Sequence, residues 1–181
     1  MGKFKVSLGF CAAVCILAWL DLSLCGSFLL CGLCHELGHL IALRLCRIPV
    51  EKIMVGTVGA VICARFSDYS RELICAAAGP AAGMILAGAL FRCAPKVALV
   101  SVLLSAVNLL PLYPLDGGRM LRAVLGLCCR PQTTERVTHI AAAATCCVLM
   151  VLACWGTVYF KMGLWPIFAA LVLLWRVADR E

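Results

Sequence analysis

The chain has 181 residues, of which 64% are hydrophobic and 14% charged, and its mean hydropathy is +1.04. This composition excludes an ordinary soluble domain and predicts a single all-α polytopic membrane domain over residues 1–181. The net charge of +7 does not indicate nucleic-acid binding, because the basic residues are scattered at the ends of apolar segments instead of forming one stripe.

The apolar runs and their breaks predict about six transmembrane helices. Each crossing of a bilayer core about 30 Å thick needs roughly 20 apolar residues, so the chain has room for about six. The first run has a basic end but lacks a small-residue cleavage site, so we expect an uncleaved helix. The predicted helices cover residues 6–20, 22–43, 73–91, 97–115, 137–160 and 162–175.

A short β-strand or hairpin insert is predicted after the second helix. The segment EKIMVGTVGAVICARFSDYSRE is too polar at its ends, and too rich in glycine and β-branched residues, to be another span. Its centre, Thr57–Phe66, predicts one or two short strands.

The distribution of basic residues predicts the orientation in the membrane. With the N-terminus in the cytosol, only Arg92, Lys96 and Lys161 of the 16 Lys and Arg residues lie outside. We therefore expect a multi-pass protein of the cell membrane, of bacterial type, with both termini cytosolic. The 14 cysteines lie mostly within apolar stretches and are interpreted as small buried side chains facing a reducing cytosol.

The second predicted helix contains HELGH, residues 35–39. Positions i and i+4 share a helix face, so His35 and His39 can direct imidazole nitrogens at one metal ion, with Glu36 beside them. This spacing is typical of a zinc site in which the glutamate is the general base for a water molecule. The alternative is a polar contact in which these side chains hydrogen-bond to neighbouring helices.

Asp116 is the candidate third ligand, since catalytic zinc usually has three protein ligands. Of the nine acidic residues, all except Glu36 and Asp116 fall in predicted loops, at helix ends or at the terminus. Asp116 follows Pro111 and Pro114, which should break or bend the fourth helix. Arginines mark the cytosolic ends of both predicted helices, so both motifs are expected near the cytosolic leaflet.

Two other types of residue are candidate ligands. Cys31 and Cys34 lie close enough to His35 for thiolate ligation, but a closed Cys/His site would leave Asp116 unexplained. The remaining histidine, His139, is interpreted as an interfacial or helix-packing residue.

Together, HELGH and the later NLLPLYPLDG resemble the motifs of the site-2 family of intramembrane metalloproteases, and within it the compact sporulation-type branch similar to stage IV factor FB. Gly79–Pro80 adds to the resemblance. It implies that His35, His39 and Asp116 bind one Zn²⁺ ion per chain, that Glu36 activates the water, and that Asn108 helps to position the substrate.

The resemblance also implies partners. The substrate would be a membrane-associated or transmembrane protein, such as a pro-sigma factor, cut near the cytosolic face, and regulatory membrane proteins would control cleavage. Neither a CBS nor a PDZ domain is expected. Gly83 stands where related sequences often have asparagine, so Gly79, Gly83 and Ala87 are interpreted as a small-residue face for helix packing.

The predicted strand suggests how a substrate helix could be unwound. An extended substrate could pair with it by strand addition, which makes Gly59 and Val61 candidate substrate-binding residues. A structural hairpin that covers the site is an equally good interpretation. The competing function is a non-proteolytic zinc-binding membrane scaffold or a transporter, although a transporter should show inverted repeats or a polar path through both leaflets.

Overall fold

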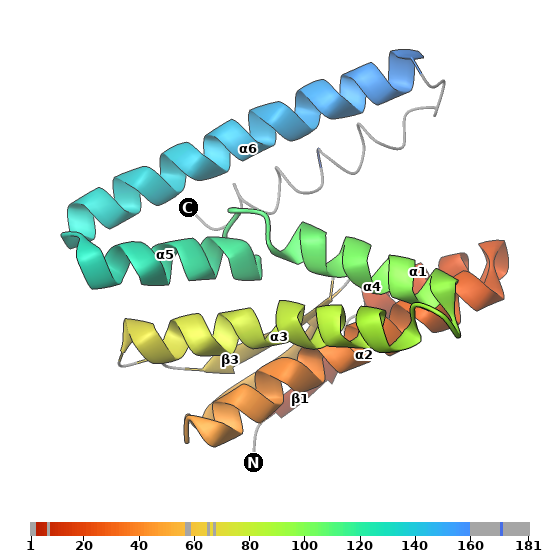
Figure 1. The fold of residues 1–181 in the computed structure, drawn as a ribbon, viewed down its shortest axis with the longest axis horizontal. Coiled ribbons are helices and arrows are strands. Elements are labelled where there is room, and N and C mark those ends of the chain that lie inside the picture. Colours follow the sequence, from red (N-terminus) through yellow and green to blue (C-terminus); the bar gives the residue numbers. More distant parts are fainter. Residues whose placement is uncertain are drawn as a thin grey trace. The chain divides into compact units, whose positions relative to one another are not determined.

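The computed structural model describes residues 3–6, 8–56, 59–64, 66, 68–159 and 171 and is mostly helical. The chain forms two compact units, Met1–Leu109 and Leu110–Glu181. The first unit contains β1 (Lys3–Val6), α1 (Leu8–Leu20), α2 (Leu22–Leu45), β2 (Val50–Gly56), β3 (Gly59–Ala64), α3 (Tyr69–Leu90) and α4 (Pro95–Asn108) (Figure 1). The second contains α5 (Asp116–Cys128) and α6 (Pro131–Tyr159).

Helices α2, α3 and α4 begin at residues that suit a helix N-terminus. The carboxylate of Asp21 accepts a hydrogen bond from the Leu24 N–H (3.0 Å) at the start of α2, and Asp68 accepts one from the Ser70 N–H (3.2 Å) at the start of α3. Pro95 opens α4, where its missing N–H costs nothing. The cap at Asp68 explains why α3 starts one turn earlier than predicted.

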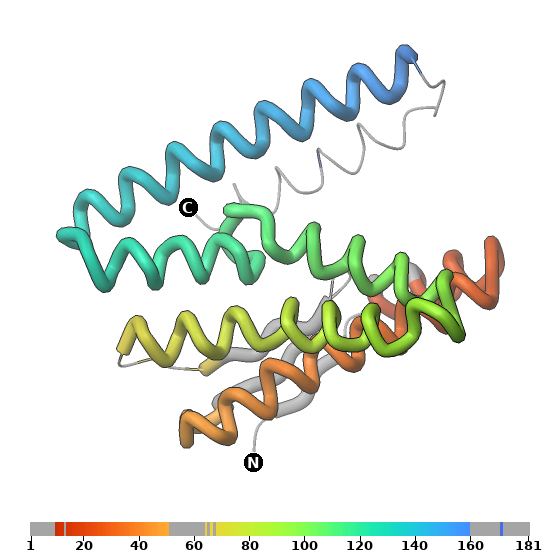
Figure 2. The backbone as a smooth tube through the Cα atoms, in the orientation of Figure 1, coloured from red at the N-terminus to blue at the C-terminus, as the bar shows by residue number. Residues whose placement is uncertain are grey.

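Small residues let α3 pack closely against both α2 and α4 (Figure 2). A Cβ atom added at Gly38 of α2 would lie 2.5 Å from the carbonyl oxygen of Ala78 and 2.8 Å from the Cβ of Ala82. One added at Gly83 of α3 would overlap the hydroxyl of Ser105 on α4. Gly79, Gly83 and Ala87 are all buried, which agrees with the predicted small-residue face.

A three-stranded sheet with the order β1-β2-β3 belongs to the same unit. The insert between α2 and α3 forms β2 and β3, which pair antiparallel from Val50↔Ala64 to Gly56↔Gly59. The insert therefore contains a hairpin, although its first strand precedes the predicted segment. β1 pairs parallel with β2, and this strand was not predicted because its alternating sequence, KFKV, is only four residues long.

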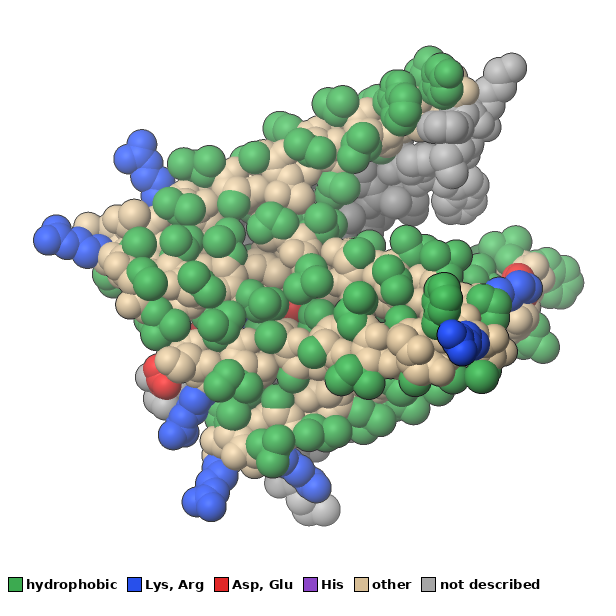
Figure 3. All heavy atoms as spheres, in the orientation of Figure 1, with side chains coloured by type: hydrophobic (Ala, Val, Ile, Leu, Met, Phe, Trp, Pro, Cys, Tyr) green, Lys and Arg blue, Asp and Glu red, His purple; other side chains and the backbone are tan. Residues whose placement is uncertain are grey.

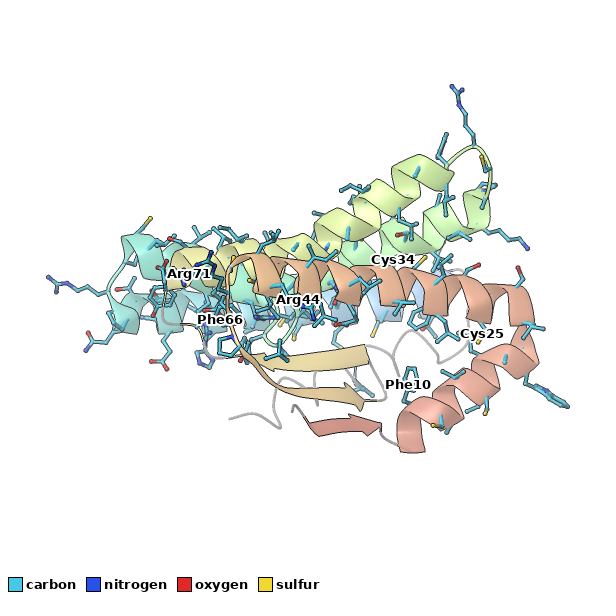
Figure 4. The ribbon with its side chains drawn as sticks, turned by 90° about the horizontal axis from the view of Figure 1, so that it is seen from below. Phe10, Cys25, Cys34, Arg44, Phe66 and Arg71 are labelled. Atoms are coloured by element: carbon cyan, nitrogen blue, oxygen red, sulfur yellow. The ribbon has the colours of Figure 1, made fainter. Side chains whose placement is uncertain are left out.

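The hairpin is anchored on the α2–α3 pair. Ala42 and Leu43 of α2, Ile48 and Cys75 form a buried apolar cluster. Val50, Ala64 and Phe66, at the base of the hairpin, pack against this cluster. Figure 4 shows the strands lying along α2.

The prediction of one helix over residues 97–115 is wrong at its C-terminal end. α4 stops at Asn108, and the segment with Pro111 and Pro114 is not helical; the Tyr113–Pro114 peptide bond is cis. A separate helix, α5, then begins at Asp116 and packs against α6. α6 starts at Pro131 instead of the predicted residue 137, because proline is well suited to the first turn of a helix.

The described residues contain three helices long and apolar enough to cross a membrane, namely α2, α3 and α6. Residues 10–20 of α1, together with α4, are apolar but shorter. Six transmembrane helices are therefore not supported, and the last predicted helix, 162–175, lies outside the described residues except for Leu171. Hydrophobic side chains cover the outer faces of the helices in Figure 3, and Lys and Arg side chains stand near helix ends.

Candidate metal centre

The two histidines of HELGH converge on one point. Both residues belong to α2, and both are buried. Their Nε2 atoms are 3.2 Å apart, and the rings meet edge to face. Two nitrogen ligands of one tetrahedral zinc ion, each at about 2.0–2.1 Å from the metal, would be separated by about 3.3 Å. The imidazole pair therefore fits a single metal ion without rearrangement.

The orientation of His39 is fixed from α3. Its Nδ1 atom lies 2.7 Å from the backbone carbonyl oxygen of Cys75. A carbonyl can only accept, so Nδ1 carries the proton and donates it. The lone pair of the neutral ring is then on Nε2, the atom that faces His35. This is the tautomer that a metal ligand requires.

Gly79 of α3 leaves the space that the imidazoles occupy. A Cβ atom added there would overlap Nε2 of His39 and would lie 2.5 Å from its Cε1 and 2.8 Å from Nε2 of His35. No side chain can be accommodated at this position unless a histidine moves. The sequence indicated Gly79 as a packing residue and did not predict its contact with the two imidazoles.

Glu36 follows His35 in α2 and is half-buried. A helix turns by about 100° per residue, so its side chain leaves the helix beside the imidazole face and not on it. This is the position expected of a general base that is not itself a ligand.

Asp116 is the first residue of α5, in the second unit, and it is also buried. The preceding segment folds back tightly on this helix: a Cβ atom at Gly118 would lie 2.5 Å from the backbone nitrogen of Tyr113. The guanidinium of Arg122 lies 5.4 Å from the centre of the Tyr113 ring. These contacts hold the proline-rich segment against the N-terminus of α5, where the carboxylate is presented.

As a set of donors, His35, His39 and Asp116 could hold a metal ion, since each is buried and offers one ligand atom. The chemistry of the set, two imidazoles and one carboxylate, is that of many catalytic zinc sites.

The other candidate residues have different surroundings. The Asn108 side chain, half-buried at the end of α4, donates to the carbonyl of Leu104 (3.0 Å). The Cys31 thiol is buried and donates to the carbonyl of Val97 on α4 (3.5 Å), so its hydrogen bond is directed toward that helix. His139 is exposed on α6. Gly59 and Val61 lie on β3.

Comparisons with known proteins agree with the motifs. Residues 95–152 match the sequence model of Peptidase family M50, which supports the resemblance to site-2 proteases. A zinc metalloprotease of Methanocaldococcus jannaschii is 30% identical over 104 residues, which are 50% of this chain and 31% of that protein. The chain thus spans about a third of this curated relative.

The fold is similar to that of a solved structure, the site-2 protease from Methanocaldococcus jannaschii. The TM-score is 0.72 at 20% sequence identity, and the match covers 98% of this chain and 89% of the other. The likeness extends over both units, each of which therefore has a counterpart in that fold.

Proposed function

We propose that this protein is an intramembrane zinc metalloprotease that cleaves a membrane-embedded protein substrate. The observation that carries the proposal is the imidazole pair, whose Nε2 atoms are 3.2 Å apart, with Cys75 fixing the tautomer of His39. In this proposal His35, His39 and Asp116 hold one zinc ion, and Glu36 is the catalytic residue. The name of the curated relative and the match to Peptidase family M50 support the same activity.

The mechanism follows from the positions of the proposed zinc ligands and Glu36. When bound, zinc would polarise the scissile carbonyl and make a water molecule acidic enough to attack it. The Glu36 carboxylate accepts a proton from the attacking water and donates it to the departing amine nitrogen. His39 keeps its orientation throughout, because its Nδ1–H remains bonded to the Cys75 carbonyl.

We propose further that the substrate is held by the hairpin. β2 pairs with β1 on one side and β3 on the other, so the outer edge of β3, with Gly59 and Val61, is where another strand could be added. Asn108 would contact the same substrate near the end of α4. The alternative, a hairpin that only covers the site, predicts no crosslinks from cysteines introduced at Gly59 or Val61 while cleavage continues.

The finer features of the family resemblance belong to the same proposal. They are a single domain in a multi-pass membrane protein with both termini cytosolic, membership of the sporulation-type branch, a pro-sigma factor as one candidate substrate, and control by regulatory membrane proteins. The competing function is a zinc-binding scaffold or a transporter. Glu36 argues against a scaffold, because a purely structural zinc site needs no general base.

The decisive experiment compares Glu36→Gln with the wild type. Purified Glu36→Gln protein should keep one zinc per chain by elemental analysis, and its cells should lose the membrane-protein fragments that wild-type cells produce, as measured by membrane proteomics. Glu135→Gln, at an exposed position near the start of α6, is the matched control and should keep both zinc and fragments. Unchanged fragments in the Glu36→Gln cells would refute the proposed activity.

A further inference from the structure

The Asp116 carboxylate has a charged neighbour on its own helix. Nη1 of Arg119 lies 3.8 Å from Oδ1 of Asp116, one helical turn away, and the two side chains are 21% and 8% exposed. Both residues belong to α5, so this ion pair is a property of that single helix.

This pair differs from an ordinary surface salt bridge. An exposed pair contributes little, because water screens it and two flexible side chains must be ordered. Here the carboxylate is almost completely buried and the arginine mostly so, which weakens the screening. The acidic residue also comes first along the helix, which is the favourable direction for such a pair.

We propose that Arg119 is a positioning residue for the third metal ligand. A carboxylate has two oxygens, and a permanent positive charge close to Oδ1 restricts rotation of the group, so that the other oxygen is presented to the metal. The inference rests on the proposed function, since it takes Asp116 as a ligand.

The neighbouring arginine on α5 has a different task. Arg122 lies over the ring of Tyr113 and holds the segment that precedes the helix. Arg119, by contrast, lies within ion-pair distance of the ligand carboxylate itself. Groups that orient a metal ligand in this way typically alter metal affinity by about 10- to 100-fold when they are removed.

The test measures zinc affinity of the detergent-purified full chain by competition with a chromogenic chelator. Arg119→Gln should weaken zinc binding by about 10- to 100-fold. Arg119→Lys should recover most of the loss, because it keeps the charge. Arg130→Gln removes an exposed arginine just after α5 and should bind zinc as the wild type does. The visible spectrum of the cobalt-substituted protein should shift in Arg119→Gln and not in Arg130→Gln.

Asp116→Ala separates this inference from the proposed function. If Asp116→Ala loses zinc while Arg119→Gln binds it with wild-type affinity and an unchanged cobalt spectrum, the positioning role is refuted and the ligand assignment stands. If Asp116→Ala keeps wild-type zinc affinity, the ligand assignment itself fails.

If Arg119→Gln does not fold, Arg119→Met, which retains the apolar stem, takes its place. Wild-type zinc affinity in that variant would overturn the inference. If Arg119→Lys binds zinc no more tightly than Arg119→Gln or Arg119→Met, the inference is also overturned, because the positive charge would then have no effect on zinc affinity.

Discussion

The imidazole pair shows what residue spacing can and cannot predict. The i, i+4 spacing of His35 and His39 predicts that their side chains share one helix face, and the structure brings their Nε2 atoms to 3.2 Å from each other. The contacts from α3 were not predicted, because they depend on how two helices pack. A backbone carbonyl, such as that of Cys75, leaves no signature in the sequence. Gly79–Pro80 is part of the family resemblance, but only the structure shows that Gly79 lies against the imidazoles of His35 and His39.

Gly79 yields a prediction at this scale. Gly79→Ala should reduce zinc affinity by about 10-fold or more, because its Cβ would overlap His39 and displace its imidazole from the proposed zinc site. The measurement is zinc content after dialysis against a weak chelator. Gly88→Ala is the matched control on the same helix, since a Cβ atom there meets nothing within 4 Å.

The two variants should also differ in stability. Alanine favours a helix over glycine by about 0.5–1 kcal/mol, so Gly88→Ala should be neutral or slightly stabilising. If Gly79→Ala retains zinc as well as Gly88→Ala does, α3 does not approach the histidines as closely as described.

The elements were predicted best where they are long and uninterrupted. α2 and α3 were placed to within a few residues, and the insert between them was recognised from its glycine and β-branched residues. The sequence did not predict α5 as a separate helix, because the apolar run of the fourth predicted helix continues through Pro111 and Pro114. Pro111 and Pro114 predict a break or bend in the fourth helix, but the helix that follows them is amphipathic and not long enough to register as a span.

The α2–α3 contact yields the second prediction. Gly38→Ala should lower the free energy of unfolding by about 1–3 kcal/mol, because its Cβ would lie 2.5 Å from the backbone oxygen of Ala78, which has little freedom to move. Thermal unfolding of the metal-free protein in detergent measures this without interference from zinc. Gly32→Ala, on the same helix with nothing within 4 Å of the added Cβ, should unfold like the wild type. Equal midpoints for the two variants would contradict the close contact.

At the scale of the whole molecule, composition predicted a membrane protein correctly but overstated the number of spans that the structure supports. Hydropathy counts apolar residues, and it does not detect that α4 has only 14 helical residues. Such a helix is about 21 Å long, shorter than a hydrocarbon core of about 30 Å. Whether α4 crosses the membrane therefore tests one of the six predicted spans directly.

Two exposed cysteines provide the test. Cys93 lies between α3 and α4 next to Arg92, and Cys129 lies between α5 and α6 next to Arg130. If α4 crosses, the positive-inside rule places Cys93 outside and Cys129 in the cytosol. In variants that keep one of these cysteines and no other, a membrane-impermeant maleimide should then label Cys93 in intact cells and Cys129 only after permeabilisation. Labelling of both from the same side would mean that α4 does not cross, and Asp116 would have to reach the histidines from that side of the membrane.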